Sequence, residues 1–120
     1  MAREVEQTLR RSLLFVAASY EETCWRPAAD VYRTADGWLV KFELAGVALE
    51  DIEITFCGQH LTVQGERRDR TIGDCRQSYS MEICYSRFLR TVELPEPLLA
   101  AAIAAEHRDG MLIVRLMESP

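Results

Sequence analysis

A chain of 120 residues has room for one domain and for little beyond it. An apolar fraction of 48% and a charged fraction of 28% are typical of a folded globular protein and argue against a disordered chain. The net charge of -5, with 14 basic residues that form no stripe, argues against nucleic acid as a partner. No apolar run approaches the roughly 20 residues that span a bilayer, so we expect no membrane span.

The first 24 residues have the pattern of an amphipathic helix. Apolar side chains recur there at helical spacing, at Val5, Leu9, Leu13, Val16, Ala17 and Tyr20. Leu14 and Phe15 widen this stripe beyond what one packed face needs. We therefore expect a helical segment over residues 1–24, whose apolar side meets the domain, another subunit or another molecule.

The N-terminus and the cysteines both favour a reducing compartment. Glu4 and Glu6 stand where a secretory signal is basic, so we expect a cytoplasmic protein. The four cysteines are widely spaced and contain no C-x-x-C pair: Cys24, Cys57, Cys75 and Cys84. We expect all four to be free thiols.

From Trp25 onward the apolar pattern changes to a period of two, which is typical of half-buried strands. Strands are expected at residues 29–33, 38–43, 51–56, 60–65, 79–94, 103–107 and 111–117. A charged loop covers residues 66–78, with room for one short strand, and residues 98–102 suit a turn of helix. The last two strands are expected to form a hairpin around Asp109-Gly110. The pattern predicts an all-β, immunoglobulin-like antiparallel β-sandwich over residues 25–117, followed by a short tail, 118–120.

Five segments of this region, in order and at matching spacing, resemble motifs of one family. They are Trp25-Arg26-Pro27 with Asp30-Val31-Tyr32 (W-x-P-x-x-D-V-Y), residues 43–47 (E-L-P-G-V, with Ala45 for proline), residues 61–67 (L-T-I-S-G-E-R), Phe88 to Pro95 (F-x-R-x-x-x-L-P), and Ala105 with Gly110-Met111-Leu112 (A-x-x-x-x-G-V-L). The chain thus resembles the alpha-crystallin domain of the small heat-shock proteins. The resemblance implies an ATP-independent holdase chaperone that binds unfolding client proteins and prevents their aggregation, without a cofactor and without enzymatic activity.

The resemblance also implies a dimer. The distance from Arg67 to Phe88 is that of the bacterial and plant branch, in which this loop carries a strand that swaps into the partner. By resemblance, the interface residues are Arg68, Asp69, Arg70, Thr71, Ile72 and Arg90. Arg90 alternates in step with apolar residues of its strand, so its side chain starts on the apolar face. Its guanidinium therefore needs carboxylates or carbonyl oxygens as hydrogen-bond partners.

The sequence departs from the family after the last expected strand. Members usually carry an I-x-I tail that docks between two strands of a neighbouring dimer, whereas only residues 118–120 follow Met117 here. We therefore expect a dimer, or a small or mixed oligomer, with an unfilled groove. The expected client-binding surfaces are Leu9, Leu13, Leu14, Phe15 and Val16 on the helix, and Ile52, Ile54, Phe56 and Ile103 along the groove.

Other classes of function have weaker support in the sequence than the holdase. His60 and His107 fall at strand ends where solvated histidines are common, and Cys57 with His60 supplies two of the four ligands of a structural zinc site, so catalysis and a metal are not expected. The alternative is an adaptor or co-chaperone-like module that docks one specific partner, or a subunit of a mixed oligomer. A thiol redox protein is a weaker third possibility.

Overall fold

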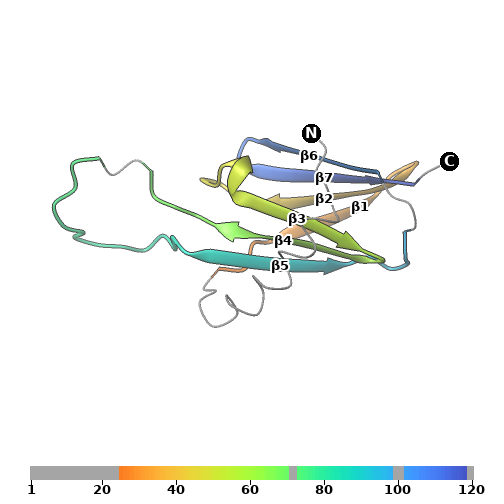
Figure 1. Cartoon of the computed structure of the whole chain (residues 1–120), viewed down its shortest axis with the longest axis horizontal. Coiled ribbons are helices and arrows are strands. Elements are labelled where there is room, and N and C mark those ends of the chain that lie inside the picture. Colours follow the sequence, from red (N-terminus) through yellow and green to blue (C-terminus); the bar gives the residue numbers. More distant parts are fainter. Residues whose placement is uncertain (1–24, 71–72, 99–101, 119–120) are drawn as a thin grey trace.

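The computed structural model describes residues 25–70, 73–98 and 102–118, and these form a two-layered β-sandwich (Figure 1). The strands are β1 (Ala29–Arg33), β2 (Gly37–Glu43), β3 (Ile52–Cys57), β4 (His60–Glu66), β5 (Arg87–Glu93), β6 (Ala102–Arg108) and β7 (Met111–Met117), with a short 3-10 helix η1 (Leu49–Asp51) before β3. The predicted antiparallel sandwich is confirmed. The helix expected over residues 1–24 lies outside the described residues.

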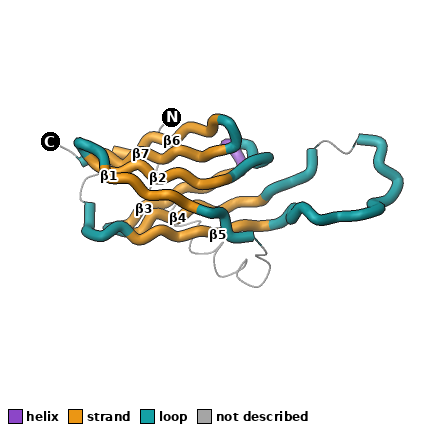
Figure 2. The backbone as a smooth tube through the Cα atoms, turned by 180° about the vertical axis from the view of Figure 1, so that it is seen from behind, coloured by secondary structure: helices purple, strands orange, loops and turns teal. Residues whose placement is uncertain are grey.

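The two layers are a four-stranded sheet, ordered β1-β2-β7-β6, and a three-stranded sheet, ordered β3-β4-β5. All of their strand pairings are antiparallel, and Figure 2 shows the two layers from behind. The register aligns Val31 with Val40, Val40 with Val114, and Val114 with Ala105. Because residues opposite each other point to the same face, this row lies on the inner side of the four-stranded sheet.

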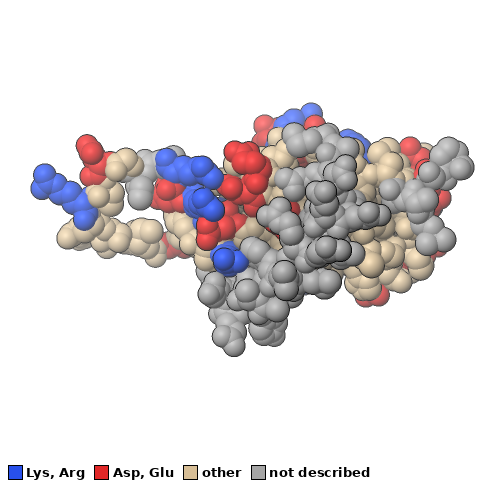
Figure 3. Space-filling view, in the orientation of Figure 1, with Lys and Arg blue, Asp and Glu red and all other residues tan. Residues whose placement is uncertain are grey.

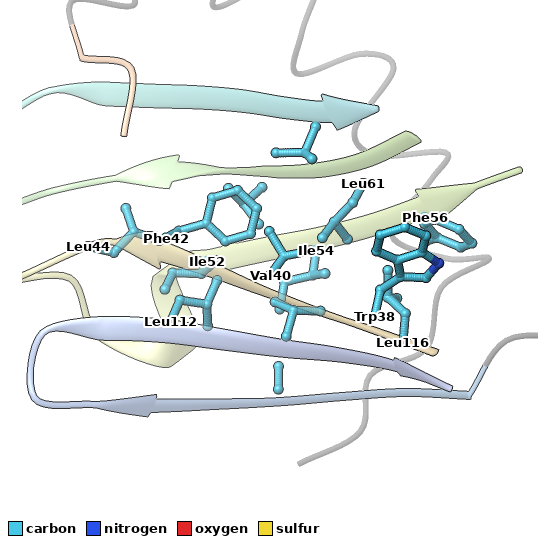
Figure 4. Packing of buried hydrophobic residues seen from close by; sticks show 14 of the residues in the cluster. Trp38, Val40, Phe42, Leu44, Ile52, Ile54, Phe56, Leu61, Leu112 and Leu116 are labelled. Atoms are coloured by element: carbon cyan, nitrogen blue, oxygen red, sulfur yellow. The ribbon is translucent and has the colours of Figure 1, made fainter. Parts of the chain in front are cut away.

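The core lies between the two inner faces. Figure 4 shows Val40 and Phe42 of β2 facing Ile52 and Ile54 of β3, and all four side chains are at most 1% exposed. Burying an aliphatic or aromatic side chain of this size contributes about 1.5–3 kcal/mol. The period-two alternation read from the sequence is therefore the alternation between this core and the outer faces.

Two glycines mark places where the backbone leaves no room for a side chain or needs a positive φ. A Cβ on Gly65 of β4 would lie 2.0 Å from the carbonyl oxygen of Asp51, the last residue of η1, so only glycine lets β4 lie this close to the start of β3. Asp109 and Gly110 have φ of 54° and 79°, which is the geometry of a two-residue hairpin turn between β6 and β7. The Asp-Gly hairpin expected from the sequence is thus present.

The strand expected over residues 79–94 is wrong in its first half. Only Arg87–Glu93 is a strand, and residues 79–86 carry no strand. The physical reason is that β4 ends at Glu66, opposite Arg87, so residues 79–86 have no neighbouring strand within the described chain. The turn of helix expected at 98–102 falls largely on residues 99–101, which lie outside the described residues; Ala102 already belongs to β6.

Candidate functional site

We call residues 67–86, which connect β4 to β5, the long loop; its described residues, 67–70 and 73–86, extend away from the sandwich (Figures 1 and 2). Four large apolar side chains of its second half are exposed: Tyr79 (99%), Met81 (61%), Ile83 (59%) and Tyr85 (37%). They occupy alternate positions, so in an extended segment they share one face. This is the pattern of a half-buried strand whose covering layer is missing, and exposed apolar surface of this kind marks a site of interaction.

Arg67 fixes the base of the long loop to the domain. Its Nε and Nη2 atoms donate to the carbonyl oxygen of Cys84 at 3.0 and 2.8 Å, and Nη1 donates to the carbonyl of Ala45 at 3.3 Å. Its backbone N–H donates to the carbonyl of Ser86 at 3.0 Å, and its guanidinium lies 3.7 Å from the ring centroid of Trp25. A planar cation suits both tasks, since it can stack on an aromatic face and donate in its own plane.

Trp25 and Arg90 attach the segment before β1 to β5. The rings of Trp25 and Phe88 meet edge-to-face, with centroids 5.3 Å apart. Arg90 donates from Nη1 to the carbonyl oxygen of Pro27 at 3.1 Å, so the carbonyl partner expected from the sequence is present. Desolvation by burial, and then repulsion from Arg26, lower the pKa of Arg90. Arg90 therefore holds two segments of one chain together, and its predicted role between subunits stays a prediction.

The strand β1 forms an edge of the four-stranded sheet. It pairs with β2 on one side and is the last strand of its sheet on the other. Val31 and Tyr32 are 41% and 44% exposed, although Val31 lies in the inner row of the sheet. An edge strand of this kind presents unpaired backbone groups and serves as a template for a further strand.

The predicted interface residues at the start of the long loop make ion pairs within the chain. Arg68 Nε lies 2.7 Å from Glu66 Oε1, and Arg70 pairs with Asp51. These charges gather where the loop leaves the sandwich (Figure 3), and exposed pairs of this kind contribute little to stability. Asp69 is described beside them, whereas Thr71 and Ile72 lie outside the described residues. The interface role of these five residues stays a prediction.

The predicted client groove differs from what the structure shows. Ile52 and Ile54 are 0% and 1% exposed and Phe56 is 9% exposed, since all three belong to the core between the sheets. Ile103 is half-buried and packs against that core. These side chains do not line an open surface of the subunit; the two strands of the expected groove, β3 and β6, are terminal strands of their sheets. The helix residues Leu9, Leu13, Leu14, Phe15 and Val16 lie outside the described residues.

The expectation of four free thiols is wrong for one cysteine. Cys57 and Cys75 are free and exposed, whereas Cys84 is disulfide-bonded. Spacing along the sequence could not reveal this bond, because disulfide formation depends on distance in space.

Each of the two histidines lies near one oxygen atom of the described chain. His107 Nε2 lies 2.9 Å from the carbonyl oxygen of Leu44, and the exposed His60 Nε2 lies 3.9 Å from Glu93 Oε1. Within residues 25–70, 73–98 and 102–118, no group of three or more His, Cys, Asp or Glu side chains is placed to hold a metal ion. No helix in this part of the chain has the length and apolarity to cross a membrane.

Sequence reasoning missed that the apolar side chains in the second half of the long loop are exposed. The alternation through Tyr79, Met81, Ile83 and Tyr85 predicts a strand, but it does not tell whether that strand belongs to the sandwich of the same chain. The stacking of Arg67 on Trp25 gave no signal, since the two residues lie far apart in the sequence.

Comparison with known proteins gives a consistent result. The model of the Hsp20/alpha crystallin family matches residues 30–120. Spore protein SP21 of Stigmatella aurantiaca is 30% identical over 94 residues, which are 78% of this chain and 56% of that protein. Heat shock protein 16 of Schizosaccharomyces pombe is 33% identical over 95 residues, covering 75% of this chain and 64% of the relative. The chain thus spans between about half and two thirds of the length of these relatives.

Solved structures agree. Heat shock protein 16.0 from Schizosaccharomyces pombe superposes with a TM-score of 0.67 at 30% identity, over 78% of this chain and 87% of that one. HSP18.5 from E. histolytica, at 24% identity and a TM-score of 0.64 over 78% of this chain and 88% of that chain, shares the fold. Proteins of this family are non-enzymatic chaperones. The match over most of its length, the sandwich and the five motifs show that the chain belongs to the Hsp20/alpha crystallin family.

Proposed function

We propose that the chain is a subunit of an ATP-independent holdase that works as a dimer, in which the long loop of each copy adds to the β1 edge of the other. The observation that carries the dimer is the apolar face of residues 79–85, left exposed on a loop that extends away from its own sandwich (Figure 1).

The long loop and the edge of β1 have complementary properties. The loop supplies an alternating apolar segment that lacks a neighbouring strand, and β1 is a five-residue edge strand with Val31 and Tyr32 exposed. Adding a strand to an edge satisfies backbone donors and acceptors along its length, and the alternate side chains are covered at the same time. The loop points away from the sandwich that carries it, so a second copy is the natural source of the edge. A reciprocal exchange of this kind is a closed, two-fold interface.

Client binding needs exposed or dynamic apolar surface and no bond-making site. A holdase that binds unfolded chains keeps them from aggregating by mass action, which consumes no nucleotide. The pattern of Leu9, Leu13, Leu14, Phe15 and Val16 supports the N-terminal segment as one such surface. The edges of β3 and β6 support a second, at which an extended client segment adds as a strand with little sequence preference. We place this activity in the cytoplasm, with non-native proteins as partners and no cofactor.

Light scattering tests the holdase. A heat-labile model protein is warmed without ATP, with and without the chain at matched subunit concentration, and a stable folded protein of similar mass serves as the control. The proposal expects the chain to suppress scattering of several unrelated model proteins, whereas the control protein does not. Unchanged scattering while circular dichroism shows the chain still folded contradicts the holdase and favours the adaptor.

Sedimentation velocity tests the dimer separately. The proposal expects a concentration-dependent equilibrium between one and two subunits. A single monomeric species at every concentration up to the micromolar range contradicts the exchange of loops, whatever the scattering result.

A further inference from the structure

The outer face of the three-stranded sheet carries polar side chains that are buried. Leu61 and Val63 of β4 belong to the core, so Thr62 and Gln64, which alternate with them, point to the outer face. Gln64 is nevertheless 0% exposed, and Thr55, which lies opposite Thr62 on β3, is 4% exposed. Every strand of the described chain belongs to one of the two sheets, and the four-stranded sheet covers only the inner side. A further layer therefore covers the outer face around Gln64.

The side-chain amide of Gln64 shows what this layer has to supply. Its Oε1 and Nε2 atoms are both buried, and neither has a hydrogen-bond partner in the described chain. A buried amide without partners costs stability, because water satisfies both atoms in the unfolded chain. The layer over Gln64 must therefore combine apolar side chains, which exclude water, with a polar group that can meet the amide.

The chain enters the domain close to this face. Residues 1–24 precede Trp25, whose ring packs on Phe88 of β5 and whose backbone forms an isolated parallel bridge with the same residue. Leu89, the next residue of β5, lies opposite Gln64. Neighbouring strands are about 4.8 Å apart, whereas 24 residues extend roughly 36 Å as a helix. The segment before Trp25 thus ends about one strand away from Gln64 and is long enough to cross the whole sheet.

The sequence of residues 1–24 meets both requirements. Leu9, Leu13 and Val16 belong to the apolar stripe of the expected helix. Ser12 follows Leu9 by three residues and precedes Val16 by four, so on a helix its hydroxyl lies beside that stripe. One face of the helix therefore offers apolar side chains together with a hydroxyl that can both donate to an amide and accept from it.

The outer face of the four-stranded sheet is a poorer match for this stripe. The register places four residues in one row across it: Asp30, Lys41, Ile113 and Glu106. Three of the four are charged, and Asp30 and Glu106 are exposed. Covering this row with apolar side chains would remove those charges from water, which is costly. The row through Gln64 contains one charged residue, so it is the more favourable of the two outer faces.

We propose that residues 1–24 dock on the outer face of the three-stranded sheet of their own chain, with the apolar stripe over Gln64 and the Ser12 hydroxyl at its amide. Docking covers Leu9, Leu13 and Val16, which are also part of the proposed client-binding surface. The docked chain is then a resting form, and release of the segment exposes the surface that binds clients. This last consequence rests on the proposed holdase, whereas the docking itself does not.

Limited trypsin digestion of the full chain measures docking without a client and below the dimer Kd. Cutting after Arg10 and Arg11, followed by mass spectrometry, tracks the population in which the segment is released. At pH 8, Gln64→Glu keeps the size of the side chain but places a charge under the segment, so cutting should speed up about tenfold or more. Thr91→Glu is the matched control, because it adds the same charge at an exposed position of β5, and its rate should stay within about threefold of wild type.

A second variant changes the segment and leaves the sheet intact. Leu13→Ser weakens the apolar stripe, so the half-buried Leu89 should become more accessible on the outer face. Hydroxyl-radical labelling read by mass spectrometry should therefore increase at Leu89 by about twofold or more. Labelling of Tyr32, which is 44% exposed on β1, should not change and serves as the internal control.

The outcomes separate the docking from the proposed function. Equal cutting of wild type and Gln64→Glu, with both sandwiches folded by circular dichroism, overturns the proposal, and so does unchanged labelling of Leu89 in Leu13→Ser. Protection of Arg10 and Arg11 that appears only as protein concentration rises places the segment on a second copy and also overturns it. If Gln64→Glu releases the segment and neither protein suppresses light scattering by clients, the docking stands and the proposed holdase fails.

Discussion

Placing a charge on the apolar face of the long loop should weaken the dimer strongly. Fully burying an isoleucine or methionine side chain contributes about 1.5–3 kcal/mol. Met81 and Ile83 are 61% and 59% exposed in the single chain. Burying this exposed part in a dimer interface therefore contributes roughly 0.9–1.8 kcal/mol for each side chain. A symmetric dimer contains each residue twice, so replacing one position removes about 2–4 kcal/mol, and an ionised glutamate adds a desolvation cost.

Sedimentation velocity across a dilution series is the assay for this prediction. A loss of about 2–4 kcal/mol corresponds to a rise of roughly 30-fold to 1000-fold in the dimer Kd for Ile83→Glu. The matched control is Ser80→Glu, which adds the same charge to the same loop at a position of opposite parity. Its Kd should change by less than about threefold, since a solvated surface charge costs little. An unchanged Kd for Ile83→Glu, or an equal rise for both variants, refutes the burial of this face between subunits.

Three further predictions concern the stability of the sandwich. Gly65→Ala places a Cβ 2.0 Å from the carbonyl oxygen of Asp51, so urea unfolding should show a loss of about 1–3 kcal/mol or more, and an unchanged midpoint contradicts the tight approach of β3 to β4. Arg90→Met removes the donor to the Pro27 carbonyl but also a desolvated charge, so a net loss of about 1 kcal/mol is expected in the same assay, and a gain in stability contradicts a tethering role. Glu96→Ala breaks the exposed ion pair between Arg33 Nη1 and Glu96 Oε1, which are 3.6 Å apart, and should change the unfolding free energy by less than about 0.5 kcal/mol. A larger loss of stability contradicts the view that this pair is a weak surface contact.

The fold could be predicted because its signals are local. Alternation through Trp38, Val40 and Phe42 gave β2 to within one residue, and the Asp109-Gly110 turn gave the hairpin of β6 and β7. Each of these signals depends on neighbours in the sequence. The alternation also identified the buried faces of β2, β3 and β4.

The candidate site could be predicted only in part, because alternation does not say where the covering layer comes from. Tyr79 and Met81 alternate as strand residues do, but at odd positions, whereas Phe88 and Val92, the buried residues of β5, are at even positions. They lie past the end of β4, so no strand of the described chain pairs with them. Likewise, the pattern through Ile52 and Ile54 showed an inward face but not that the two sheets close over it. The disulfide of Cys84 depends on a distance in space, which no spacing in the sequence gives.

Hydrogen exchange measured by mass spectrometry at two protein concentrations tests the central claim most directly. The proposed dimer predicts that the amides of residues 79–85 and of β1 (Ala29–Arg33) exchange more slowly above the dimer Kd than below it, and that both segments slow together. The edges of β3 and β6 should not change with concentration. Protection that appears at those edges while β1 and residues 79–85 exchange equally at both concentrations contradicts the exchange of loops.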